Sequence, residues 1–291
     1  FNVPNIVIGL TVVAFGTSAP ELVINVTGAL QGKTDLAFGN AVGSNLANFG
    51  LVLGIAAIMS PIYLQGQVIR REVPFLLLIT AILLVMVWDA PLSGTQALLD
   101  RGDAIILFLL FTVFVYFMVR DFISAEGDPL LVEGDNLSSK ASGNGLVNTA
   151  LLLIGLVLLV VGGEMTIDNG VAIAKIMGVS EVVIGMFVLA VGTSLPELVT
   201  SGIAAYKKET DLALGNIVGS NIFNSLVVLP AAAIIRPLPI PEGGDWDLAV
   251  GGAFVLVIIP LFLFSNARLG RLAGIGLITS YFLYLYIRFN F

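Results

Sequence analysis

Two glutamates, Glu21 and Glu197, lie inside long apolar stretches, and each follows a proline and a Gly-Thr-Ser step. A carboxylate at membrane depth costs several kcal/mol, roughly 2.5–3.5 on insertion scales, so it is rare and usually functional. Proline removes a backbone donor and is expected to free carbonyls of the preceding turn. Carboxylate, hydroxyl and carbonyl oxygens are the ligands that hard cations take. The two stretches therefore predict a cation-binding site inside a membrane.

A kinked helix whose glutamate is salt-bridged to a basic partner is the structural alternative. Neither motif helix carries a Lys or Arg before its polar end. The expected freed carbonyls belong to residues one turn before each proline, which are Ala14, Thr17, Ala190 and Thr193. These observations favour cation binding over a simple kink.

Both glutamates belong to a hexapeptide that occurs twice, with the second copy 176 residues after the first. The copies are Gly16-Thr17-Ser18-Ala19-Pro20-Glu21 and Gly192-Thr193-Ser194-Leu195-Pro196-Glu197. A second motif repeats at the same offset, as Gly39-Asn40-Ala41-Val42-Gly43-Ser44-Asn45 and Gly215-Asn216-Ile217-Val218-Gly219-Ser220-Asn221. Internal repeats fix the architecture. Two halves of one fold are therefore expected to contribute equivalent residues to one site.

The second motif adds polar candidates on the helix that follows each glutamate. Two pairs stand four residues apart and so share a helical face; they are Ser44 with Asn48 and Ser220 with Asn224. Their repetition favours cation ligation. Asn45 and Asn221 point about a quarter-turn away, and both ligation and interhelical hydrogen bonding suit them. The motif glycines at 39, 43, 215 and 219 are interpreted as close-packing positions.

Composition places the chain in a membrane. The 291 residues are 57% hydrophobic and 11% charged, whereas soluble domains carry about 25% charged residues. The absence of Cys and His removes disulfides, thiolate metal sites and the usual pH switch. No basic patch or nucleic-acid motif accompanies the net charge of −7. We expect hard cations and the lipid bilayer as partners, with no cofactor, no nucleic acid and no obligate protein partner.

Nine apolar stretches approach the roughly 20 residues that span a ~30 Å hydrocarbon core. They are Val3–Leu30, Leu36–Met59, Val73–Trp88, Ala104–Val119, Leu146–Asn169, Val179–Tyr206, Leu212–Ile235, Leu248–Phe264 and Leu272–Tyr286. The predicted fold is all-α and polytopic, with a first repeat half at 1–120, a connector at 121–145 and a second half at 146–291. The helix at 146–169 has no counterpart after residue 1, so a tenth, N-terminal helix absent from this chain is expected.

Five helices per unit is an odd number, so successive units enter the membrane from opposite sides. Inverted repeats of this kind place their site near the midplane, on interrupted helices at the repeat interface. With the connector in the cytoplasm, eight of the 13 Lys and Arg residues lie inside and five outside. This bias has the direction of the positive-inside rule, and it predicts a cytoplasmic central loop.

The paired motifs, Gly-Thr-Ser-x-Pro-Glu followed by Gly-Asn-x-x-Gly-Ser-Asn in both halves, resemble the two alpha-repeats of the cation/calcium exchanger superfamily. The prokaryotic sodium/calcium exchanger branch is the most similar, and the resemblance covers nearly the whole chain. It implies two inverted five-helix repeats and a sodium/calcium antiporter of the prokaryotic cell membrane that works by alternating access. The ligands that it implies are Glu21, Glu197, Thr17, Ser18, Thr193, Ser194, Ser44, Ser220, Asn48 and Asn224, with the carbonyls of Ala14 and Ala190.

One position departs from part of that superfamily. Several archaeal exchangers and the potassium-dependent branch carry Asp where this sequence has Asn224. The site therefore offers two carboxylates instead of three, which balances one calcium ion and argues against potassium dependence.

Three other functions compete with sodium/calcium exchange. Glutamates in a site of low dielectric can take up protons, which makes a proton/calcium antiporter the nearest alternative. The proton-coupled branch, however, resembles Gly-Asn-Ala-x-Glu at this motif, where Thr-Ser here adds hydroxyl ligands suited to sodium. An intramembrane enzyme would need a water path and a nucleophile, and neither explains a duplicated Ser/Asn shell. A passive channel would share the ligands but not a closed, buried pair of carboxylates.

Overall fold

The computed structural model describes residues 8–63, 71–88, 94, 97–125, 189–264 and 268–290, together with scattered positions between 147 and 176. Its first half contains η1 (Gly9–Val13), α2 (Ala14–Thr17), α3 (Ala19–Leu30), α4 (Thr34–Ala47), η2 (Asn48–Val52), α5 (Leu53–Met59), β1 (Ile62–Tyr63), α6 (Val73–Val87), β2 (Leu98–Leu99) and α8 (Arg101–Ala125). Its second half contains α12 (Ala190–Thr193), α13 (Leu195–Tyr206), α14 (Thr210–Phe223), η6 (Asn224–Val228), α15 (Leu229–Ile235), β3 (Leu238–Pro239), α16 (Gly244–Phe264), β4 (Arg268–Leu269) and α17 (Arg271–Asn290).

Eight of the nine predicted helices are present, wholly or in part, among the described residues, but several begin in polar residues outside the apolar stretches. α4 begins at Thr34 instead of Leu36, α16 at Gly244 instead of Leu248, and α8 runs on to Ala125. Hydropathy marks the part of a helix that lies in lipid, whereas hydrogen bonding carries the helix into the polar boundary. α8 thus extends into the predicted connector, and residues 126–145 lie outside the described residues. Most of the predicted helix 146–169 is also outside them, although its described positions are helical.

Each motif helix is interrupted at the serine before the proline, as the sequence predicts. Ser18 leaves the helical region (φ −85°, ψ 10°), and Ser194 does the same in the second half (φ −80°, ψ 5°). Proline suits the first turn of the new helix because that turn's N–H groups have no intrahelical partner. The segments Gly9–Thr17 and Ala19–Leu30 meet at a bend of 48°. The bend places the Gly-Thr-Ser step and the glutamate on either side of a break.

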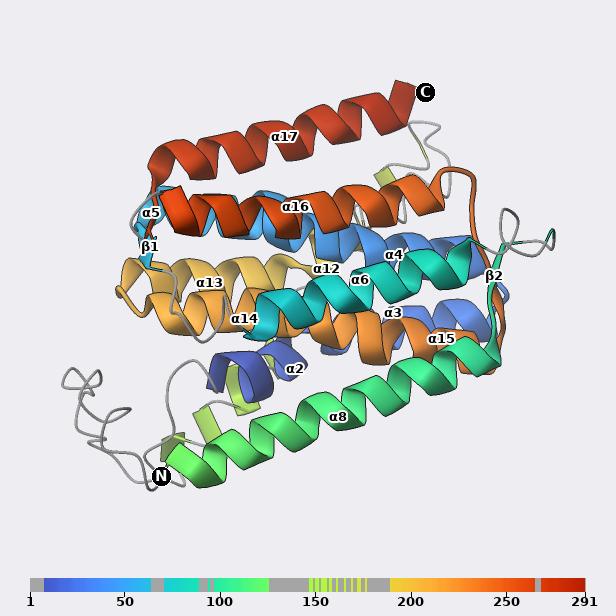
Figure 1. Cartoon of the computed structure of the whole chain (residues 1–291), viewed down its shortest axis with the longest axis horizontal. Coiled ribbons are helices and arrows are strands. Elements are labelled where there is room, and N and C mark those ends of the chain that lie inside the picture. The colour runs from blue at the N-terminus through green and yellow to red at the C-terminus, as the bar shows by residue number, and fades with distance from the viewer. Residues whose placement is uncertain are drawn as a thin grey trace.

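The two halves repeat each other element by element. Five pairs, α2 with α12, α3 with α13, α4 with α14, η2 with η6 and α5 with α15, have bounds that differ by 176 residues. Two short antiparallel strand pairs, which the sequence did not predict, join the halves: β1 pairs with β4 and β2 with β3. β1 and β2 lie at opposite ends of the helices (Figure 1). The counterpart of β1 at the 176-residue offset is β3, which pairs with β2, so these equivalent strands lie at opposite ends, as an inverted repeat requires.

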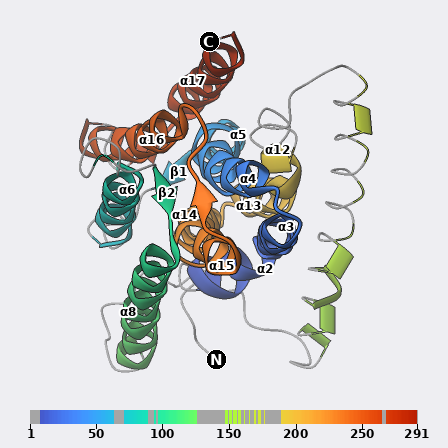
Figure 2. The ribbon, with the colours of Figure 1, turned by 90° about the vertical axis from the view of Figure 1, so that its right-hand side faces the viewer.

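The motif helices form the centre of the molecule. α14 packs against η1 and α2, and α4 packs against α12, so each interrupted helix contacts the long helix of the opposite half. Viewed along the helices, α3, α4, α13 and α14 are grouped together, while α6, α8 and α16 lie to the left of them and α17 lies above them (Figure 2). A Cβ at Gly219 would come within 2.7 Å of the Leu10 carbonyl. This close approach confirms the packing interpretation for that glycine.

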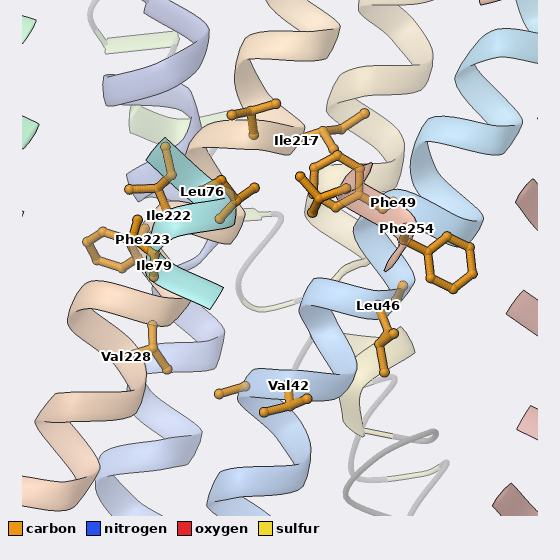
Figure 3. Close-up of a cluster of buried hydrophobic side chains, with 14 of the residues drawn as sticks. Val42, Leu46, Phe49, Leu76, Ile79, Ile217, Ile222, Phe223, Val228 and Phe254 are labelled. Carbon is orange, nitrogen blue, oxygen red and sulfur yellow. The ribbon is translucent and has the colours of Figure 1, made fainter. Parts of the chain in front are cut away.

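An apolar cluster supports these central helices from the side of α6 and α16. Figure 3 shows its labelled members, which are Val42, Leu46, Phe49, Leu76, Ile79, Ile217, Ile222, Phe223, Val228 and Phe254. They come from α4, η2, α6, α14, η6 and α16. Close-packed side chains of this kind hold the helix backbones in fixed positions, and this rigidity fixes the polar residues on the other helix faces.

Four described helical segments, 34–59, 101–120, 210–235 and 271–290, are long and apolar enough to cross a membrane. The bent pair formed by 9–17 and 19–30 would be a fifth span. Helices satisfy their own backbone hydrogen bonds, which is the requirement for crossing lipid. The chain is therefore an integral membrane protein with several spans.

Candidate cation-binding site

All twelve predicted site residues are buried, with an exposed fraction of 2% or less. They are Ala14, Thr17, Ser18, Glu21, Ser44, Asn48, Ala190, Thr193, Ser194, Glu197, Ser220 and Asn224. The break in each motif helix exposes the oxygens of its own half to the opposite half. α2 contacts α13 and α12 contacts α3, so Glu21 and Glu197 both lie at the interface between the two halves.

Hydrogen bonds across the repeat interface assemble these residues into one site. Ser18 Oγ of the first half donates to Glu197 Oε1 of the second at 2.9 Å. Ser220 Oγ donates to the same carboxylate oxygen at 3.2 Å. Ser44 Oγ of the first half lies 3.1 Å from Thr193 Oγ1 of the second. The site is therefore built from both halves at once.

Several buried oxygens in this cluster have no hydrogen-bond partner among the described residues. They are both carboxylate oxygens of Glu21, Oε2 of Glu197, Oδ1 of Asn48, Oδ1 of Asn224 and Oγ of Ser194; the amide nitrogen of Asn224 is also without a partner. A buried unsatisfied polar group costs about 1–3 kcal/mol, and more if it is charged. A cluster of unpartnered oxygens at one place is suited to bind a cation that is coordinated by oxygen ligands.

The neutral ligands matter because the acidic residues are few. The described residues contain no cluster of three or more His, Cys, Asp or Glu side chains. Calcium takes six to eight oxygen ligands, so a calcium ion bound by Glu21 and Glu197 would also need hydroxyl, amide and carbonyl oxygens. The residues around the pair supply those oxygen types.

The carbonyls of Ala14 and Ala190 are not freed in the way the prolines were expected to free them. Ala14 O still accepts from the Ser18 N–H at 3.0 Å, and Ala190 O from the Ser194 N–H at 3.1 Å. Ser220 Oγ approaches Ala14 O at 3.5 Å and Ser44 Oγ approaches Ala190 O at 3.5 Å. Pro20 and Pro196 lack the N–H that would bond the carbonyl four residues earlier, which is not the carbonyl of either alanine. Each alanine carbonyl nevertheless faces the opposite half.

Asn48 and Asn224 each begin a short π-helical segment, η2 and η6. Such segments occur frequently at functional sites because they widen the turn and redirect side chains. The sequence gives no periodicity signal for them. Asn48 Nδ2 donates to Asn221 Oδ1 at 2.9 Å, and Asn221 Nδ2 donates to the Asn45 carbonyl at 3.1 Å. Asn221 thus makes the interhelical bonds that were one of its two predicted roles.

Four further polar residues support the site and were not among the predicted ligands. Asn40 and Asn216 accept hydrogen bonds from the threonines of the opposite half, Thr193 and Thr17. Asn25 and Ser201 contact Asn40 and Asn216 in turn. The signal that could have found Asn25 and Ser201 is their equivalence: they stand 176 residues apart, one turn after each glutamate.

Two inverted repeats that meet at broken helices, with a buried cluster of oxygens between them, define a secondary transporter for cations. The comparisons with known proteins specify the class. The model of the family described as "Sodium/calcium exchanger protein" matches residues 1–120 and 147–290. The chain belongs to this family, which is a family of transporters and not of enzymes.

Relatives and solved structures agree with that assignment. The chain is 37% identical to "Putative antiporter CaxA" of Alkalimonas amylolytica, over 99% of this chain and 89% of the relative. It is 34% identical to "Inner membrane protein YrbG" of Escherichia coli (strain K12), over 98% and 86% of the two chains. A structure of the sodium-calcium exchanger NCX_Mj, soaked with Na⁺ and Ca²⁺, superimposes with a TM-score of 0.77 at 32% identity, over 97% of this chain and 86% of that chain.

Proposed function

We propose that this protein exchanges calcium for sodium across a membrane by alternating access at the site between the repeats. The observation that carries the proposal is the pair of buried carboxylates, Glu21 and Glu197, which keep three oxygens without a partner among the described residues. Two negative charges balance one Ca²⁺ or two Na⁺. The same oxygens can therefore serve either ion in turn, which is the chemical requirement for exchange.

We assign the transported ions to a shell contributed equally by both halves. The carboxylates of Glu21 and Glu197 supply the charge, and neutral oxygens complete the coordination. The neutral ligands are Thr17, Ser18, Ser44, Asn48, Thr193, Ser194, Ser220 and Asn224, with the carbonyls of Ala14 and Ala190. Hydroxyls and amides suit sodium, which needs fewer charged ligands than calcium.

A proton/calcium antiporter is the second candidate, and the burial of both carboxylates favours it. A carboxylate taken out of water binds a proton more readily, so protons could replace sodium as the counter-ion. Four hydroxyls favour sodium instead; they belong to Thr17, Ser18, Thr193 and Ser194. A sodium ion needs several oxygen ligands, whereas a proton on a carboxyl needs only one hydrogen-bond acceptor.

We also propose an orientation in a prokaryotic inner membrane. The repeat halves are residues 1–120 and 146–291, and the connector 121–145 joins them on the cytoplasmic side. The end of the molecule that contains β1 and β4 would face the cytoplasm, together with Arg268 and Arg271. The end with β2 and β3, near Arg101 and Arg236, would face outward. This choice follows the positive-inside rule.

The deciding experiment is uptake of ⁴⁵Ca²⁺ into proteoliposomes that contain the full-length protein. Vesicles loaded with sodium and diluted into sodium-free medium should take up calcium, and collapse of the sodium gradient with an ionophore should stop the uptake. Vesicles with an outward proton gradient and no sodium are the comparison. Uptake driven by protons alone would support the second candidate, and uptake without any gradient would indicate a channel.

A further inference from the structure

Each threonine of the site donates a hydrogen bond to an asparagine of the opposite repeat. Thr193 Oγ1 lies 3.3 Å from Asn40 Oδ1, and Thr17 Oγ1 lies 3.2 Å from Asn216 Oδ1. Both asparagines are fully buried. The contact therefore occurs twice, with the halves exchanged, and it is not an accident of one helix surface.

The asparagines are themselves held in one orientation. Asn40 Nδ2 donates to Asn25 Oδ1 at 2.7 Å, and Asn25 Nδ2 donates to the Ala37 carbonyl at 2.9 Å. In the other half, Asn216 Nδ2 donates to Ser201 Oγ at 2.9 Å, and Ser201 Oγ donates to the Ala213 carbonyl at 3.5 Å. An amide has donors on its nitrogen and acceptors on its oxygen. With its nitrogen engaged, each asparagine has to present its oxygen to the threonine.

This orientation decides how the threonine hydroxyl can be used. A hydroxyl has one proton and two acceptor lone pairs. An asparagine oxygen can only accept a hydrogen bond, and the same is true of the alanine carbonyls that Thr193 and Thr17 contact at 3.2 and 3.3 Å. Thr193 Oγ1 also lies 3.1 Å from Ser44 Oγ, which has a proton of its own to donate. A threonine that gives its proton to the asparagine oxygen keeps its lone pairs for a cation.

We propose that Asn40 and Asn216, oriented by Asn25 and Ser201, are positioning residues that hold the hydroxyls of Thr193 and Thr17 as cation acceptors. The inference rests on the proposed function, because it concerns ligands of the same site. We call each hydrogen-bonded chain, from Asn25 through Asn40 to Thr193 and from Ser201 through Asn216 to Thr17, a relay. Each relay links a threonine to the opposite repeat. The effect of the relays should appear in ion affinity and in discrimination between ions, since they act on ligand geometry and not on a charge.

The chain offers a matched control, because the two relays use different residues for the same task. Asn25 in the first half and Ser201 in the second occupy equivalent positions and both connect an asparagine to a carbonyl of the following helix. The substitution Asn25→Ser transfers the second half's solution to the first half. Asn25→Ala removes the relay while changing the side chain by a similar amount. A merely structural role would make serine and alanine similar.

The test measures ⁴⁵Ca²⁺ uptake at varied calcium in sodium-loaded proteoliposomes, with equal amounts of monodisperse full-length protein. We expect Asn25→Ala to raise the half-saturating calcium concentration about tenfold, as loss of a buried hydrogen bond at a charged site implies. Asn25→Ser should stay within about twofold of the wild type. Ser201→Ala examines the second relay and replaces Asn25→Ala if that variant does not fold.

The outcomes separate the relay from the proposed function. Unchanged half-saturating calcium in Asn25→Ala or Ser201→Ala, beside normal wild-type exchange, would overturn the relay alone. The relay would also be overturned if Asn25→Ser were as impaired as Asn25→Ala. Absence of sodium-coupled uptake in the wild type would overturn the proposed function, and the relay with it.

Discussion

Glu21 and Glu197 occupy equivalent positions in the two repeats, yet their carboxylates have different surroundings. Glu197 Oε1 accepts hydrogen bonds from Ser18 and Ser220. Both oxygens of Glu21 have no partner among the described residues, and Ser194, the counterpart of Ser18, has an unpartnered hydroxyl. The backbone of the site is symmetric, but its hydrogen bonding is not. One carboxylate is held in place by its neighbours, and the other keeps both oxygens for an ion.

The strongest test of this comparison removes one charge at a time. Glu21→Gln and Glu197→Gln should each reduce sodium-driven ⁴⁵Ca²⁺ uptake by roughly 100-fold or more, because removing one member of a buried charged set costs about 3–5 kcal/mol. Residual calcium binding should be weaker in Glu197→Gln. With its amide oxygen on Ser18 and Ser220, Glu197→Gln turns its one unpartnered oxygen into an amide nitrogen, whereas Glu21→Gln keeps one of its two unpartnered oxygens for the ion.

Calcium binding to the purified variants, measured by isothermal titration, ranks the two carboxylates. Gel filtration of each variant provides the folding control. Equal residual binding would show that the different hydrogen bonding has no consequence for the ion. Normal uptake by either variant would remove that glutamate from the site.

A second, smaller effect concerns the asparagines that begin η2 and η6. Asn224 has no partner among the described residues, whereas Asn48 donates to Asn221. Asn224→Asp adds a third carboxyl without breaking a bond, and like charges close together disfavour joint ionisation. At low pH the added carboxyl is protonated and the site keeps its charge. As the pH rises it ionises, so calcium uptake should fall about five- to tenfold between pH 6 and 9.

Potassium should partly restore the uptake by Asn224→Asp at high pH, because an extra monovalent cation balances the added charge. Asn48→Asp is the matched control: it also loses the donor to Asn221, so it should be impaired at every pH. The measurement is sodium-driven uptake by both variants and the wild type across this pH range, with and without potassium. A flat profile for Asn224→Asp would place this residue away from the ions.

The smallest expected effect lies in the asparagine pair that joins the halves. Asn45 Nδ2 donates to Ser225 Oγ at 3.0 Å. The counterpart of Ser225 in the first half is Phe49, which offers no acceptor, and Asn221 bonds the Asn45 carbonyl instead. Asn221→Ala loses an accepted and a donated bond, and Asn45→Ala loses one donated bond. At about 1 kcal/mol for each buried hydrogen bond, Asn221→Ala should lower the thermal stability in detergent more than Asn45→Ala. The reverse order would contradict this bonding pattern.

Much of the fold follows from the sequence because the solvent is a bilayer. Apolar length predicts where helices cross, and the proline after Gly-Thr-Ser predicts where Gly9–Leu30 is broken. The positions where prediction failed are those where hydrogen bonding, and not hydropathy, decides. The polar starts of α4 and α16, the extension of α8 to Ala125 and the two strand pairs are of this kind.

The sequence by itself determined that Glu21 and Glu197, with their Ser, Thr and Asn companions, belong together, because a duplicated polar motif in an apolar chain has few uses other than a shared ion site. Only the tertiary structure decided how the two copies differ. Packing between helices far apart in sequence decides whether Ser18 or Ser194 contacts a carboxylate and which way the Asn40 amide points. It also decides that Asn48 and Asn224 begin π-helical segments. Repetition in sequence specifies equivalent backbones, whereas a buried hydrogen bond depends on sub-ångström distances that the opposite repeat sets.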